Sequence, residues 1–130
     1  MSDYVPRPAA NAIRSRDIPE SDWRQFKKLH PILLQRFCQR TLDELARVID
    51  SPKGTFHDRY LKAYKLMGSR DRELGRIFDD YRRSTAIMQL TNMRLLHLLT
   101  NEELHLLSEE TQRIIKSLDG MREAGSDHDV

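Results

Sequence analysis

Apolar residues recur at helical spacing through most of the chain, in segments separated by turn-forming residues. One such segment covers residues 31 to 49, where intervals of three, four and seven place the apolar side chains on one helix face. A shorter helix is predicted before it, because Ser21 can cap a helix and His30 precedes Pro31, which suits the first position of a new helix. The apolar stripe of the longer helix consists of Leu34, Phe37, Cys38, Thr41, Leu45, Val48 and Ile49.

The stretch Asp50 to Gly54 is the clearest turn in the sequence. Thr55 follows it with Asp58 three residues later, which predicts a capping box at the start of a helix. Gly68 is typical of the position just after a helix end, so this helix is expected to cover residues 55 to 67. Its apolar face is predicted to contain Phe56, Tyr60, Ala63, Tyr64 and Met67.

A long fourth helix is predicted over about residues 70 to 99. Its apolar positions alternate spacings of four and three, as in a heptad repeat, with Asn92 as a polar residue within the series. A second capping box, Thr100 with Glu103, then predicts a short helix, and Ser108 is expected to cap the last one. The heptad-like series is Leu74, Phe78, Tyr81, Thr85, Met88, Asn92, Leu95 and Leu99.

No strand-like alternation and no internal repeat interrupts this pattern, so the predicted fold is an all-α, small antiparallel helical bundle of four to five main helices. Residues 1–18 are expected to be a flexible N-terminal arm, 19–120 a single helical domain, and 121–130 a disordered acidic tail.

The amino-acid composition is typical of a globular protein with a highly charged surface. The 130 residues are 38% hydrophobic and 32% charged, with a net charge of +2, and the apolar runs are too short to span a bilayer. The basic residues concentrate in the middle of the chain and the acidic ones after residue 102. The chain contains one cysteine, which cannot form an internal disulfide, so we expect a cytoplasmic protein.

Candidate chemistry is sparse. No nucleophile motif and no glycine-rich phosphate loop is present, and Cys38 lies in an apolar stripe, which favours a structural thiol. No two of the five histidines share the spacing of three or four residues that converges on a metal ion. The sequence therefore predicts no catalytic residue, no cofactor and no metal site.

The densest chemistry is IFDDYRRS, residues 77 to 84. Its acidic and basic residues can pair along one helix as a solvated face. Alternatively, they can meet the preceding helix in a polar interaction site formed by Arg59, Tyr60, Tyr64, Arg70, Asp71, Asp80 and Arg83.

The heptad-like series raises a second question, because its apolar side chains can form either the core of the domain or a contact with another copy. If they form a contact, the predicted self-association surface is Met88, Asn92, Leu95, Leu96 and Leu99.

These observations favour a non-enzymatic, cytoplasmic protein-interaction or regulatory module that self-associates through the helix around residues 70–99 and has no membrane partner. The alternative is a nucleic-acid-binding protein that uses the basic surface of the helices at 31–49 and 55–67, through residues such as Arg36, Arg40 and Lys62. An enzyme with a helical pocket lined by Tyr60, Tyr64, Asp80 and Arg83 is the third interpretation.

Overall fold

The structure of the chain is a computed structural model that describes residues 17–127. Within this range the secondary structure is helical, without strands, and the predicted all-α class is confirmed. The helices in chain order are α2 (Glu20–Asp50), α3 (Phe56–Phe78), the 3₁₀ turn η1 (Arg83–Thr85), α4 (Ala86–Leu95), α5 (Asn101–Leu104) and α6 (Glu109–Asp127).

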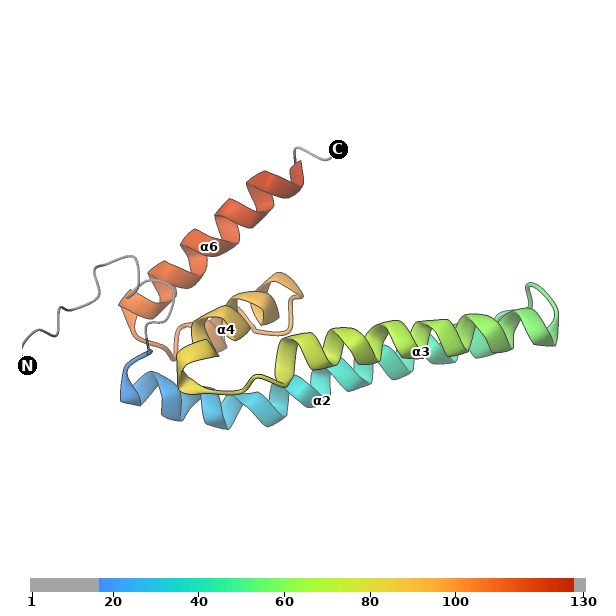
Figure 1. Cartoon of the computed structure of the whole chain (residues 1–130), viewed down its shortest axis with the longest axis horizontal. Coiled ribbons are helices and arrows are strands. Elements are labelled where there is room, and N and C mark those ends of the chain that lie inside the picture. Colours follow the sequence, from blue (N-terminus) through green and yellow to red (C-terminus); the bar gives the residue numbers. More distant parts are fainter. Residues whose placement is uncertain (1–16, 128–130) are drawn as a thin grey trace, which may run out of the picture.

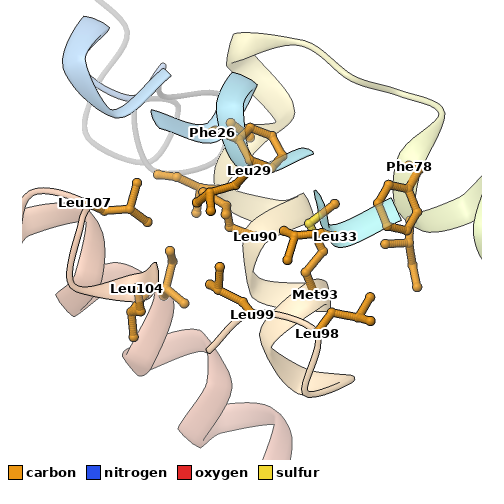
Figure 2. Close-up of a cluster of buried hydrophobic side chains, with 14 of the residues drawn as sticks. Phe26, Leu29, Leu33, Phe78, Leu90, Met93, Leu98, Leu99, Leu104 and Leu107 are labelled. Atoms are coloured by element: carbon orange, nitrogen blue, oxygen red, sulfur yellow. The ribbon is translucent and has the colours of Figure 1, made fainter. Parts of the chain in front are cut away.

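The hydrophobic core lies at one end of the molecule, which we call the head. The first half of α2 packs there against α4, α5 and the start of α6, and Figure 2 shows how Leu29 and Leu33 approach Leu90, Met93 and Leu99. Buried apolar side chains of this kind supply most of the stability of a small domain. The core comprises Ile18, Phe26, Leu29, Leu33, Phe37, Ile77, Phe78, Ala86, Ile87, Leu90, Met93, Leu98, Leu99, Leu104, Leu107 and Ile115.

The second half of α2 and most of α3 form a two-helix hairpin that projects away from the head. The two helices lie side by side along this projection, and the chain reverses between Asp50 and Phe56 (Figure 1). No side chain between Thr41 and Ile77 is buried, and the residues along the contact line of the two helices are half-buried. The hairpin therefore has no hydrophobic core of its own.

Two predicted helix ends are wrong. The structure has one helix across Pro31, where a break was expected, and α3 continues through Gly68 to Phe78. Pro31 lies between Leu29 and Leu33, which are both buried in the core, and this packing offsets the local cost of a proline in a helix. Past Gly68, α3 keeps its contact with α2 through Arg70 and Glu44.

The predicted long fourth helix is also wrong, because the chain leaves the helical path between Phe78 and Ala86. The Thr85 hydroxyl donates to the Asp80 and Arg82 carbonyls and accepts from the Arg82 N–H, local bonds that compete with helix formation. The break allows Tyr81 to stack on His30, with ring centroids 3.8 Å apart.

The predicted domain boundaries fall near the ends of the described range. Residues 1–16 of the expected arm and 128–130 of the expected tail lie outside it, whereas α6 continues past Gly120 to Asp127. In residues 17–127 we find no helix whose length and apolar content would let it cross a membrane.

Candidate functional site: the apolar face of the hairpin

One side of the projecting hairpin carries large apolar side chains that nothing in the described chain covers. Phe56, Tyr60 and Tyr64 of α3 are 84%, 68% and 72% exposed. Leu42, Ile49 and Met67 beside them are 58%, 53% and 41% exposed. We call these six residues the apolar hairpin face. Exposed apolar patches larger than a few hundred Å² are uncommon on monomeric proteins and often mark sites where another molecule binds.

A shallow groove shows that both helices contribute to the same side of the hairpin. Leu42 of α2 and Met67 of α3 line this groove, whose volume is about 290 Å³, together with Cys38, Asp71 and Leu74. Residues three, four or seven positions apart share a helix face, so Ile49 lies on the same side as Leu42. By the same spacing Phe56, Tyr60 and Tyr64 continue the line from Met67 toward the hairpin tip.

The opposite side of the hairpin is charged. A hollow there is lined by Arg47, Lys53, Arg59 and Lys62, with the Glu44 carboxylate and the apolar side chains of Val48 and Leu66 beside them. Along the contact line, Arg70 donates to both carboxylate oxygens of Glu44, with Nε–Oε1 and Nη2–Oε2 distances of 2.9 and 3.0 Å. The Arg70 hydrogen bonds hold the pKa of Glu44 below its usual value. The hairpin therefore separates an apolar side from a charged side.

Local hydrogen bonds fix the hairpin tip. Gly54 has a φ of +82°, which favours glycine, and the predicted capping box of Thr55 and Asp58 is present. The bond from the Thr55 backbone N–H lowers the pKa of the Asp58 carboxyl. Arg59 donates to the Ile49 and Ser51 carbonyl oxygens at the end of α2, and its guanidinium lies 4.8 Å from the Phe56 ring centroid. These contacts hold Phe56 in place at the tip.

The structure does not bring the predicted polar interaction site together. Asp80 binds Arg82 through two hydrogen bonds, which lower the pKa of the Asp80 carboxyl, and Arg83 donates to Ile18 and Glu20 at the start of α2. The remaining members lie along the hairpin: Arg59 at the tip, Tyr60 and Tyr64 on the apolar hairpin face, Arg70 paired with Glu44, and Asp71 beside Met67.

The predicted self-association surface is divided between core and surface. Leu99 is buried, Leu96 packs against the core, and Leu95 and Asn92 are half-buried. Met88 is exposed. These five residues therefore form no continuous apolar surface, because Leu96 and Leu99 pack into the core of the head.

Two arginines of the nucleic-acid interpretation have partners in the head. Arg36 donates to Glu103 and to the Leu98 carbonyl, and Arg40 donates to the Leu96 and His97 carbonyls. Lys62 lies on the charged side of the hairpin. The basic surface of α2 is thus largely engaged with the segment that follows α4.

Within residues 17–127 no group of three or more His, Cys, Asp or Glu side chains is placed to hold a metal ion. Comparison of the chain with protein-family models, curated proteins and solved structures finds no match in any of the three.

The sequence pattern placed Phe56, Tyr60, Tyr64 and Met67 on one apolar helix face and named Tyr60 and Tyr64 in the polar interaction site, but it did not predict that this face is exposed. The width of the apolar sector on this helix was an available signal. Together with Ala63, the four residues cover a wider sector than a helix needs to pack against one neighbour.

Proposed function

We propose that this protein is a non-enzymatic protein-interaction module and that it binds its partner through the apolar hairpin face. One observation carries the proposal: the hairpin has no buried side chain between Thr41 and Ile77, yet it exposes three aromatic and three aliphatic side chains on one side. Helices in proteins gain most of their stability from packing an amphipathic face. A partner on this face would supply the layer that the hairpin lacks.

Aromatic residues and methionine are enriched at protein interfaces, where they provide large contact areas and few charges need to be desolvated. The apolar hairpin face has this composition, with Asp71 at its edge near the head. This location replaces residues 70–99 as the proposed contact surface. We keep the cytoplasm as the proposed location, because the chain contains only one cysteine.

The nucleic-acid alternative has less support. The charged side of the hairpin keeps Arg47, Lys53 and Lys62 available, but Glu44 lies among them and Arg36 and Arg40 bind the head. The enzyme interpretation has less support as well, because its four residues do not line a common pocket. Tyr60 and Tyr64 are exposed on the hairpin, whereas Asp80 binds Arg82 and Arg83 binds Ile18.

Site-specific photo-crosslinking tests the proposal in the native cell. A photoreactive phenylalanine analogue replaces Tyr60 on the apolar hairpin face, and in a matched variant it replaces Lys65, which is exposed and lines a hollow beside Lys62. We expect discrete protein adducts from position 60 and few from position 65. Equal yields at the two positions, or no adduct at position 60, would contradict the proposal.

A further inference from the structure

We infer that the partner of the apolar hairpin face is a second copy of this chain, and that two hairpins pair in antiparallel orientation to form an intermolecular four-helix bundle. The inference rests on the proposed function and names its partner. Three observations support it: the spacing of the apolar residues, the area that they expose, and the position of Asp71 at one end of the face.

The spacing fits a helical partner. On α3 the residues Tyr60, Tyr64, Met67, Asp71 and Leu74 follow one another at intervals of four and three, as do Leu42, Leu45 and Ile49 of α2 at intervals of three and four. Such rows accept the side chains of a facing helix as knobs into holes. A two-helix layer is completed into a bundle by a second two-helix layer of similar length, which an identical hairpin provides.

The exposed area is sufficient for a stable dimer. At about 200 Å² for a whole aromatic side chain, the three aromatic residues offer roughly 450 Å² per copy and the whole face roughly 700 Å². Complete burial of two such faces would remove about 1,400 Å² of surface from water, and stable interfaces bury about 1,200–2,000 Å² in total. A symmetric contact needs the same patch on both partners, and here one patch supplies both sides.

The charges favour the antiparallel orientation. Asp71 is exposed and lies at the end of the face that is near the head, whereas Phe56 lies at the tip. In an antiparallel pair, the two Asp71 carboxylates lie at opposite ends of the interface. A parallel pair would place the two Asp71 side chains at the same level, and their like charges would oppose that contact.

The mass of the full-length chain in solution tests the pairing. Multi-angle light scattering should give twice the chain mass of 15.3 kDa at micromolar concentration. Leu42→Glu and Tyr64→Glu should each shift the dimer dissociation constant upward by at least 100-fold and leave the helical circular-dichroism signal unchanged. Ile32→Glu introduces the same change at an exposed position of α2 near Pro31 and should keep the dimer. An uncharged second variant, Tyr64→Ser, should weaken the dimer as well.

Crosslinking tests the orientation. Cys38 is the single native cysteine and lies at the head end of the groove, so His57→Cys adds one thiol at the tip. A bismaleimide with a reach of ~10 Å cannot join positions 38 and 57 within one chain, because the intervening part of α2 alone rises by ~18 Å. We expect crosslinked dimers in which peptide 38 is joined to peptide 57. Crosslinks confined to 38–38 and 57–57, or a dimer without any 38–57 crosslink, would overturn the antiparallel arrangement.

The outcomes separate the two proposals. A wild-type protein that stays monomeric up to millimolar concentration, while position 60 still crosslinks to another protein in the cell, would overturn the second copy as partner and leave the proposed function standing. A dimer that persists in both glutamate variants would overturn the inference and also remove the apolar hairpin face as the contact. A dimer lost in these variants and kept in Ile32→Glu supports both.

Discussion

Arg36 of α2 and Glu103 of α5 form a double hydrogen-bonded ion pair, with Nη1–Oε1 and Nη2–Oε2 distances of 2.6 and 2.7 Å. Arg36 Nη1 also donates to the Leu98 carbonyl at 2.8 Å, and Arg40 binds the neighbouring Leu96 and His97 carbonyls. These bonds hold the segment after α4 against α2, where His97 has a φ of 59°. α2 runs from the head into the hairpin, and these bonds attach the segment after α4 to its middle.

Loss of the Glu103 charge should destabilise the head. Glu103→Gln keeps an acceptor for the Thr100 N–H but removes the charge that faces Arg36, so we expect the free energy of unfolding to fall by about 1–3 kcal/mol. Urea denaturation measures the change. Glu102→Gln, at an exposed position one residue earlier, serves as the control and should shift stability by less than about 0.5 kcal/mol. Equal effects of the two variants would contradict the role of the pair.

Asp22 should contribute strongly to stability from a buried position. Its carboxyl group accepts from the Ser108 N–H and hydroxyl and from the Thr111 hydroxyl, at 2.8, 2.7 and 2.6 Å, and so binds the start of α6 to α2. Asp22→Ala leaves these donors unsatisfied and should cost about 2–4 kcal/mol. Asp43→Ala, an exposed position of the same helix, is the matched control in chemical denaturation. A loss at Asp22 no larger than at Asp43 would show that the Asp22 carboxylate does not stabilise the contact between α2 and the start of α6.

Acid should destabilise the protein through His30. Burial lowers the pKa of His30 below 6.5, and a hydrogen bond with the Phe78 backbone opposes this shift in part. The unfolded chain therefore takes up the proton at higher pH than the folded chain. The contribution of neutral His30 to the unfolding free energy is therefore complete above pH 6.5. It falls as the pH drops below 6.5 and levels off below the pKa of His30 in the folded protein.

Denaturation at pH 7.5 and 5.5 checks this expectation. Wild-type protein should lose more stability between the two than His30→Phe, which cannot titrate at this position. A nuclear magnetic resonance titration in which His30 protonates at or above pH 6.5 would rule the explanation out.

Two glycine substitutions should have opposite signs. Gly54 has a left-handed conformation, and a Cβ there would lie 3.1 Å from Asp58, so Gly54→Ala should cost about 1–2 kcal/mol. Gly68 lies inside α3, where a Cβ would meet no atom closer than 3.6 Å, so Gly68→Ala should raise stability by up to about 1 kcal/mol. Thermal unfolding measures both. A destabilising Gly68→Ala would indicate that α3 ends there after all.

The sequence predicted the features that depend on neighbouring residues. The helical class, the turn before Thr55 and the capping boxes of Thr55 and Thr100 are all present. Each rests on spacing of three or four residues, which a helix converts directly into proximity.

The sequence did not predict the features that depend on distant contacts. α2 continues through Pro31 because its neighbours pack in the core, and α3 continues through Gly68 because Arg70 contacts Glu44 of α2. Tyr81 stacks on His30 at the break after Phe78. The apolar hairpin face was missed for the same reason. Periodicity shows that Tyr60 and Tyr64 share a helix face but does not show whether another element of the chain covers it.

Methionine oxidation tests most directly whether the apolar hairpin face is an interface. Met67 belongs to this face, whereas Met88 lies on α4 within the surface first predicted for self-association, and they are 41% and 50% exposed. Mass spectrometry of peroxide-treated protein can follow both residues at nanomolar and at high micromolar concentration. We predict that Met67 oxidation slows severalfold as the concentration rises, while Met88 oxidation does not change. Met67 oxidation that is independent of concentration, or protection of Met88 in its place, would contradict the account.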